Sequence, residues 1–156
     1  VLLAKTLRQQ RVDFMASYSV LGGGFNFKFV NDMPDIAENM IDVNHWYNPG
    51  SASGQAMRAR TEADGKYFTF EVYCAYMSIM FLADGFERAG TTDSEAVNAS
   101  LAASELEVDF MPYDKTNMVN GQNMGSRAVA IQAQKGDVQI IAPSKYASAN
   151  AVFPRG

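Results

Sequence analysis

The stretch from Phe86 to Val97 restricts the fold of this chain more than any other part of the sequence. It predicts a helix that ends at Gly90, because glycine adopts the left-handed backbone of a helix end at little cost. After a link of two threonines it predicts a second helix, Asp93 to Ala103, opened by a capping box of Thr92 and Glu95. Two successive helices are therefore expected in the middle of the chain.

The helix that ends at Gly90 is predicted to begin at Tyr67 and to be the longest in the chain. Its apolar residues are spread over nearly every side of the axis: Phe68, Phe70, Tyr73, Tyr76, Met77, Met80, Phe81 and Phe86. A helix with this pattern packs on more than one face. The longest apolar stretch, Tyr67 to Ala83, is interrupted by polar residues and is short for a bilayer span, which favours a buried helix over a membrane helix.

Helices and strands alternate along the rest of the chain. Further helices are expected at 1–11, 25–33 and 53–63, and strands at 12–21, 39–46, 128–134 and 138–142. The last two strands flank Lys135-Gly136-Asp137, which predicts a β-hairpin. Interleaved helices and strands indicate an α/β fold.

Composition narrows the classes of partner. The chain has 156 residues, of which 47% are hydrophobic, enough for the core of one ordinary domain. Its net charge is -4, and no cluster of Lys and Arg offers a surface for phosphates. We therefore expect no nucleic-acid partner.

Several catalytic arrangements are excluded by residue type. A single cysteine, Cys74, excludes an internal disulfide and a cysteine zinc site, and a single histidine, His45, excludes a histidine-rich metal cluster. The segment 50–54 resembles a nucleophile elbow, but Ala52 stands where the nucleophile is required. We expect no enzymatic activity, no metal and no cofactor.

Three consecutive glycines, Gly22, Gly23 and Gly24, follow an expected strand and precede Phe25. They permit either a sharp turn or close approach of a ligand to the backbone. No phosphate-loop lysine and no dinucleotide-type glycine spacing accompany them, so nucleotide binding is disfavoured. Ligand contact and a simple tight turn remain as alternatives.

The segment 86–97, together with Met111-Pro112-Tyr113, Asn120-Gly121-Gln122-Asn123 and Val152-Phe153-Pro154-Arg155, resembles a known family. In order and spacing these segments are similar to the C-terminal half of periplasmic solute-binding proteins of the branched-chain amino acid type, which serve ABC importers. The resemblance implies part of a two-lobed type I periplasmic-binding fold with three-layer α/β lobes. It also implies that the N-terminal half, with any secretion signal, is missing from this sequence.

The resemblance further implies that the chain passes between the lobes. Residues 1–44 and 125–156 are expected in one lobe and residues 45–124 in the other. The expected partners are an amino acid or similar small solute and a membrane permease, with association to the missing half or to another copy as a further possibility. The expected location is the periplasm, or a tethered position outside the cytoplasmic membrane.

The resemblance also selects site residues. The turn of Gly22, Gly23, Gly24 and Phe25 is expected at the rim of the cleft between the lobes. Aromatic side chains supply apolar area to a ligand at modest entropic cost, and Phe70 is the preferred cleft wall. Trp46 and Tyr18 are further ligand-binding candidates, although both also fit core or hinge packing; for Tyr73, core packing is preferred.

Two other functions remain open. The same fold serves as a ligand-sensing regulatory module, which fusion to a signalling domain would favour. A fragment acting as a structural or interaction subunit would have to fold cooperatively by itself.

Overall fold

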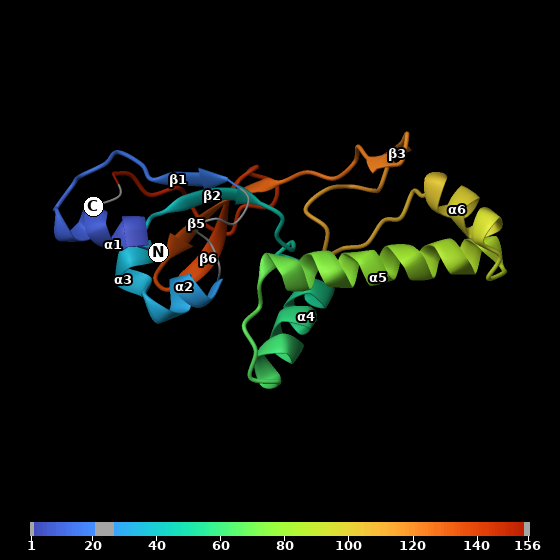
Figure 1. The fold of residues 1–156 in the computed structure, drawn as a ribbon, viewed down its shortest axis with the longest axis horizontal. Helices are drawn as coiled ribbons and strands as arrows, with labels where there is room; N and C mark the ends of the chain where they lie inside the picture. Colours follow the sequence, from blue (N-terminus) through green and yellow to red (C-terminus); the bar gives the residue numbers. More distant parts are fainter. Residues whose placement is uncertain (1, 21–26, 155–156) are drawn as a thin grey trace.

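The computed structural model describes residues 2–20 and 27–154, and its helices and strands alternate along the chain (Figure 1). The helices are α1 (Leu2–Gln9), α2 (Phe27–Asp32), α3 (Pro34–Ala37), α4 (Ala52–Ala63), α5 (Phe70–Ala89) and α6 (Ser94–Ala102). The strands are β1 (Tyr18–Val20), β2 (Ile41–Asn44), β3 (Met118–Val119), β4 (Gln122–Asn123), β5 (Val129–Gln134) and β6 (Asp137–Ala142). The expected α/β class is confirmed.

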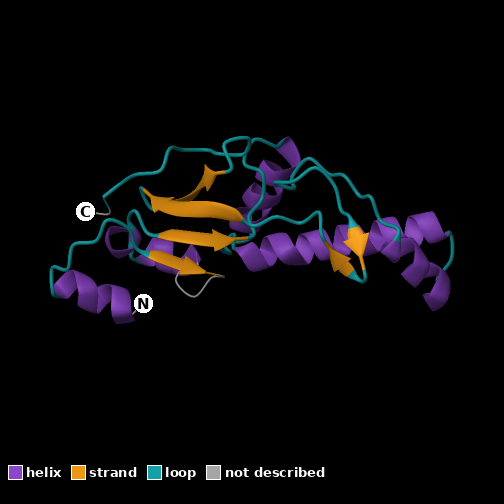
Figure 2. Cartoon of the chain, turned by 90° about the horizontal axis from the view of Figure 1, so that it is seen from above, coloured by secondary structure: helices purple, strands orange, loops and turns teal. Residues whose placement is uncertain are grey.

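The main sheet has the strand order β1-β2-β5-β6 (Figure 2). Strands β1 and β2 run parallel, whereas β2 with β5 and β5 with β6 are antiparallel. Alternate residues of β5 and β6 are buried, as the two-residue period of a strand requires. The buried set that contributes to the core consists of Val129, Ile131, Ala133, Val138 and Ile140.

The opposite face of the sheet carries apolar residues such as Ile41 beside the polar Gln132, which contacts the C-terminal tail. Gln132 is fully buried there, and its Nε2 donates to the carbonyl oxygens of Asn39 at 3.1 Å and Val152 at 3.0 Å. The backbone N–H of Val152 donates back to Gln132 Oε1 at 2.9 Å. Helices α2 and α3 contact the sheet through β6 and β5, and the further helical layer of a three-layer lobe is not among the described residues.

Helices α4, α5 and α6 and the β3–β4 hairpin form the other part of the molecule. Helix α5 extends away from the sheet as an arm, with α6 and the hairpin near its far end (Figure 1). Helix α4 begins after Ser51, whose Oγ accepts the Gly54 N–H at 3.0 Å. It ends before Gly65, which has a φ of 70° and fills the position expected for a glycine.

The structure corrects the expected boundaries of the two central helices. Helix α5 begins at Phe70 rather than Tyr67, because Thr69 is still extended. Gly90 ends it with a φ of 63°, as predicted. The capping box of Thr92 and Glu95 is wrong: Asp93 is the N-cap and accepts the Ala96 N–H at 3.0 Å, because an aspartate caps a helix at least as well as a threonine.

The sequence predicts that α5 packs on more than one face, but among the described residues only one side of the helix is buried. Its buried residues are Tyr73, which packs against Phe110, and Gly85, which lies against Leu101 of α6. The other side carries large exposed apolar residues such as Ile79, which is 64% exposed. The sequence correctly indicates an apolar helix, but the second packing partner is absent from the described chain.

Two hairpins have residues with positive φ at their turns. The predicted β5–β6 hairpin turns at Lys135 and Gly136, with φ values of 55° and 76°. The β3–β4 hairpin turns at Asn120 and Gly121, with φ values of 50° and 77°. An Asn-Gly pair is a strong hairpin signal, so this second hairpin was also predictable from the sequence.

Candidate functional site

The candidate site lies at the end of the sheet where the parallel strands β1 and β2 reach their carboxyl termini. Val20 of β1 lies beside Val43 of β2, and Asn44 lies beside Val129, the first residue of β5. Strand β6 also ends at this edge, since Ala142 pairs with Ala130. In open α/β sheets, ligands bind outside the carboxyl ends of parallel strands, so this edge is the natural place for a site.

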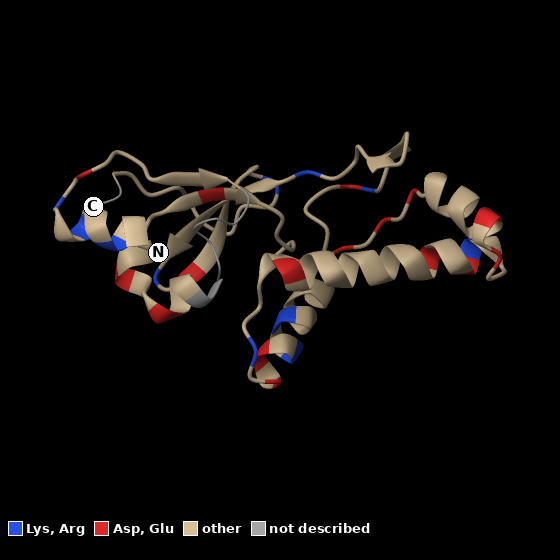
Figure 3. Cartoon of the chain, viewed as in Figure 1, with Lys and Arg blue, Asp and Glu red and all other residues tan. Residues whose placement is uncertain are grey.

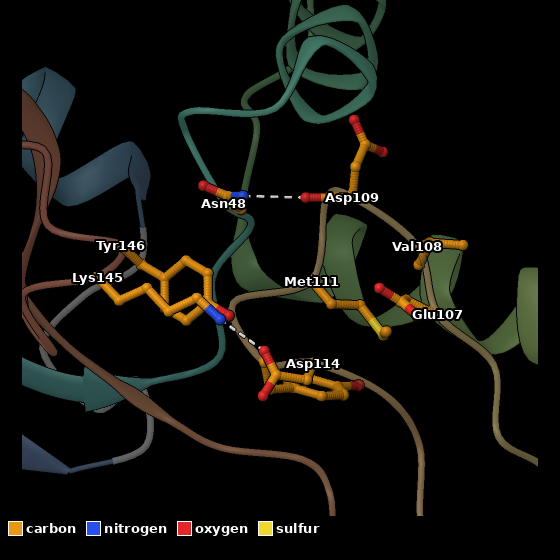
Figure 4. Close-up of a pocket in the computed structure, with 9 residues that line it drawn as sticks. Asn48, Glu107, Val108, Asp109, Met111, Asp114, Lys145 and Tyr146 are labelled. Carbon is orange, nitrogen blue, oxygen red and sulfur yellow. Dashed lines mark hydrogen bonds and ion pairs between the residues drawn. The ribbon is translucent and has the colours of Figure 1, made fainter.

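Asn48 connects the segment that leaves β2 with the segment before Tyr113. Its backbone N–H donates to the Phe110 carbonyl at 2.7 Å, and its Nδ2 donates to the Asp109 carbonyl at 3.0 Å (Figure 4). Its Oδ1 accepts the Gly50 N–H at 3.0 Å, which stabilises the turn before α4. These bonds hold two segments 61 residues apart in a fixed arrangement.

We call the place where Asn48 joins these two segments the junction. An open cavity of about 540 Å³ lies beside it (Figure 4). It is lined by Asn48, Glu107, Val108, Asp109, Met111, Tyr113, Asp114, Lys145 and Tyr146. The lining comes from the 107–114 segment, from the turn before α4 and from the loop after β6. A cavity of this volume lies within the range of small-molecule sites.

One ion pair crosses the cavity wall. Lys145 Nζ lies 2.6 Å from Asp114 Oδ1 and 5.1 Å from the centre of the Tyr146 ring (Figure 4). The hydrogen bond from Lys145 lowers the pKa of Asp114, and the same bond raises the pKa of Lys145. The pair therefore remains ionised throughout the neutral range.

The remaining carboxylates give the cavity an acidic wall. Asp109 accepts a hydrogen bond from the Ser53 hydroxyl, and Glu107 lies on the same segment. A second cavity of about 460 Å³ shares Tyr113, Asp114, Lys145 and Tyr146 with the first. It adds the cationic side chains Lys115 and Arg127, so the shared residues separate a more acidic hollow from a more basic one.

A group of aromatic rings stiffens the chain where it leaves the sheet. Trp46 is 3% exposed, and its ring centre lies 5.8 Å from Tyr47 and 5.4 Å from Phe68. Tyr47 and Phe68 pack edge to face at 5.0 Å. This cluster makes the first residues after β2 a rigid support rather than a flexible linker.

Tyr73 extends the aromatic packing along α5. Its ring lies 6.1 Å from Phe110, and its buried hydroxyl makes no hydrogen bond with a described residue. Burial, and secondarily the nearby Tyr113, raises the pKa of Tyr73, and burial also raises the pKa of Tyr113. Both phenols stay protonated, and core packing is confirmed for Tyr73, which is 2% exposed.

The described residues among those selected from the sequence do not meet in this cavity. Gly22, Gly23, Gly24 and Phe25 lie outside the described residues. Tyr18 is 59% exposed on β1, Trp46 is buried in the aromatic cluster, and Phe70 is half-buried at the start of α5 against the core. None of these three is among the residues that line the two cavities at the junction.

Sequence reasoning missed the side chains that do line the cavity. Asn48 opens the turn-forming segment Asn48-Pro49-Gly50, and Lys145 and Tyr146 follow the last strand without any motif of their own. Asp114 directly follows the Met111-Pro112-Tyr113 segment, which was the one available indication. Their proximity arises from contacts between segments 31 residues or more apart, which no local pattern reveals.

The described residues contain no group of three or more His, Cys, Asp or Glu side chains placed to hold a metal ion. Over the same part of the chain, no helix combines the length and apolar character that crossing a membrane requires.

Comparison with known proteins identifies a shared fold. No protein-family model matches the sequence, and no match was found among curated proteins. A solved structure of a leucine-binding protein from Thermotoga maritima matches with a TM-score of 0.68 and 19% identity, over 90% of this chain and 40% of that chain. A protein from Silicibacter pomeroyi, described as a branched-chain amino acid ABC transporter, matches with a TM-score of 0.68 and 16% identity, over 98% of this chain and 43% of that one.

A third structure, from Rhodospirillum rubrum and described in the same words, has a TM-score of 0.61 and 16% identity, over 88% of this chain and 40% of its own. At these identities the likeness concerns the fold. The resemblance found in the sequence is confirmed at that level: the chain has an α/β fold shared with type I periplasmic binding proteins. It spans about 40% of the length of these neighbours.

Proposed function

We propose that this chain is part of the solute-binding component of an ABC importer. It would capture an amino acid or a similar small solute between two lobes and deliver it to a membrane permease outside the cytoplasm. The observation that carries the proposal is the convergence of several chain segments at the carboxyl edge of β1 and β2, in a fold shared with proteins described as leucine-binding and as branched-chain amino acid transporters. A binding role needs no catalytic group, and the acidic and aromatic cavity wall suits recognition.

The proposal assigns residues 1–44 and 125–156 to one lobe and 45–124 to the other. The arrangement of the elements supports this division, because all four strands of the main sheet belong to the first set. Helices α4, α5 and α6 belong to the second set. The segments near Asn48 and after Gly125 would then act as the hinge about which the lobes close.

The proposed solute contacts are Gly22, Gly23, Gly24 and Phe25 after β1, with Tyr18, Trp46 and Phe70 as aromatic walls. Tyr18 is supported by its exposure on β1, the strand that the glycines follow in sequence. Phe70 is supported by its half-buried position at the start of α5, which leaves part of the ring available. Trp46 would act mainly by holding the wall rigid, because its ring is already enclosed.

The test is calorimetric titration of the polypeptide, as its gene encodes it, with L-leucine and then with the other amino acids. We expect at least one of them to bind. We also expect Phe70→Ala to weaken the dissociation constant about tenfold, a loss of about 1.4 kcal/mol, while lowering stability by less than that amount.

Phe68→Ala provides the matched control. Phe68 is fully buried, so its truncation should cost roughly 3–5 kcal/mol of unfolding free energy. A folded polypeptide that binds no amino acid would contradict the proposed function. An unchanged dissociation constant for Phe70→Ala would remove only Phe70 from the site.

A further inference from the structure

A cavity separate from the junction lies between the two parts of the molecule. It has a volume of about 570 Å³ and lies where the outer half of α4 and the segment before α5 meet the end of α2 and the β5–β6 turn. Its lining residues are Asn31, Arg58, Glu62, Gly65, Lys66, Tyr67, Gly136 and Asp137. Asp137 begins β6, and the other end of that strand, Ala142, lies at the candidate-site edge of the sheet. The two parts therefore also meet at a place remote from the hinge.

Two polar links connect the two parts beside this cavity. Arg58 of α4 binds Asp137 through two hydrogen bonds, from Nη2 to Oδ1 at 2.9 Å and from Nη1 to Oδ2 at 3.3 Å. The Tyr67 hydroxyl, in the segment before α5, donates to Oδ1 of Asp32 at the end of α2 at 3.1 Å. Each link joins residues of the proposed second lobe, 45–124, to residues of the first.

The ion pair can separate without leaving either charge unpartnered. Arg58 Nε also lies 2.7 Å from Glu62 in its own helix, and Asp137 accepts the backbone N–H of Val138 at 2.8 Å. Beyond Met57, no residue of α4 is buried. Half-buried polar contacts of this kind break and re-form more readily than packed apolar ones.

Helix α4 is held to the second part at its first turn. The Ser53 hydroxyl donates to the Asp109 carboxylate, and a Cβ built on Gly54 would lie 2.6 Å from the Tyr47 ring. Charged side chains occur along the outer half of α4, whereas residues 72–83 of α5 carry none (Figure 3). A movement of the second part would therefore carry α4 with it and would act on the polar links at its outer half.

The order of the strands indicates which movement the links resist. The chain passes between the two parts at β2 and β5, the two middle strands of the main sheet. Helix α4 lies beyond β6 and away from β1 in both views (Figures 1 and 2). Among the proposed solute contacts, Tyr18 lies on β1 and the three glycines follow that strand in sequence. Rotation of the second part toward β1 would therefore draw α4 away from β6.

We propose that the Arg58–Asp137 and Tyr67–Asp32 links form a brace behind the hinge that favours the open, solute-free arrangement of the lobes. This inference rests on the proposed function, from which it takes the lobes, the hinge and the side on which the solute binds. Closure around the solute has to break the brace, so the brace lowers the population of the closed form and with it the apparent affinity for solute.

Pulsed electron paramagnetic resonance measures the freedom of the two lobes without any solute. In the polypeptide as its gene encodes it, p-acetylphenylalanine replaces the exposed residues Gln9 on α1 and Asn98 on α6. A hydroxylamine nitroxide then labels both ketones and leaves Cys74 unmodified. We expect the double variant Asp137→Asn/Tyr67→Phe to give a broader distance distribution than the parent, because the brace no longer restrains the lobes.

Asp64→Asn is the matched control for this measurement. Asp64 lies 3.7 Å from Arg60, one turn earlier at the end of the same helix, so the variant loses the same charge without affecting the brace. It should give the parent distribution. Tyr67→Phe alone, which removes only a hydroxyl group, takes the place of the double variant if that protein does not fold.

Calorimetric titration with the amino acid that the parent binds gives a second readout. Asp137→Asn should lower the dissociation constant about fivefold, because closure no longer has to break the ion pair, and Asp64→Asn should leave it unchanged.

Two results would overturn the proposal. One is a parent-like distance distribution in the folded brace variant, and the other is a dissociation constant that Asp137→Asn leaves unchanged or raises. If no amino acid binds to the parent, the proposed function fails, while the distance distributions still decide whether the brace restrains the two parts.

Discussion

At the residue scale, side chains of opposite charge at the junction form two separate exposed pairs. Lys145 pairs with Asp114 at 2.6 Å, and Lys115 pairs with Glu105 at 2.9 Å. The hydrogen bond from the lysine lowers the pKa of the carboxylate in each pair. These pairs orient the walls of the cavities, although exposed pairs of this kind add little to stability.

The two pairs give a matched prediction about titration. Lys145→Gln should raise the pKa of Asp114 toward its ordinary value and leave Glu105 unaffected, whereas Lys115→Gln should do the reverse. Because the pKa of Asp114 is lowered on folding, its contribution to stability is present above the ordinary aspartate range and is lost as pH falls through the lowered folded-state pKa. Carboxyl carbon chemical shifts followed by NMR between pH 2 and about pH 7 measure both values. If Asp114 titrates identically in the Lys145→Gln variant, the ion pair does not form in solution.

At the element scale, the contact between α5 and α6 depends on a glycine, because there is no room for a side chain at that position. Gly85 is buried inside α5, and a Cβ built there would lie 2.8 Å from Leu101 Cγ of α6. Helix propensity alone would favour alanine over glycine at an interior position. The glycine is therefore required by the close approach of the two helices, not by backbone conformation.

Gly85→Ala should consequently destabilise the protein by about 1–3 kcal/mol, because the clash outweighs the gain in helix propensity. Combining it with Leu101→Ala should recover part of that loss, since removal of the isobutyl group makes room for the new methyl group. Urea denaturation of the two single variants and the double variant measures the coupling. Strictly additive losses would show that Gly85 and Leu101 do not constrain one another.

At the scale of the whole molecule, one ion-pair cluster joins α4 to the main sheet. Arg58 Nη2 lies 2.9 Å from Asp137 Oδ1 at the start of β6, and Arg58 Nε lies 2.7 Å from Glu62 within α4. Burial opposes the charge on Arg58, but hydrogen bonds to Asp137 and Glu62 outweigh it, so the pKa of the guanidinium is raised. This cluster links the part assigned to residues 45–124 to the hairpin of the other part.

Asp137→Asn should therefore lower the unfolding free energy by about 1–2 kcal/mol, because it removes the charge of one of the two carboxylates that pair with a half-buried guanidinium. Glu62→Gln is the control, since it removes only an interaction within one helix, worth about 0.5 kcal/mol or less. Urea denaturation of both variants at neutral pH makes the comparison. Equal losses would mean that the contact between α4 and β6 contributes no more than the local pair.

Local sequence patterns were sufficient for most individual elements of this protein. Gly90 ends α5 and Lys135-Gly136 forms a hairpin turn because the preference for positive φ belongs to those residues themselves. The apolar character of α5 could also be read directly from the order of its residues. Even the wrong helix cap was a local error, since Thr92 and Asp93 are neighbours and both residue types cap helices.

Only the tertiary structure decided which surfaces are covered and which side chains meet. The cavity wall brings Asn48, Asp114 and Lys145 together from three distant segments, and the sequence contains no spacing that encodes such contacts. The residue pattern shows that α5 is apolar on nearly every side, but it does not reveal which face is packed. Burial of a face depends on the other segments of the chain that pack against it. The sequence thus determined the helices, the hairpin and the fold class through short-range preferences, whereas the junction cavity and the exposed apolar side of α5 result from long-range packing.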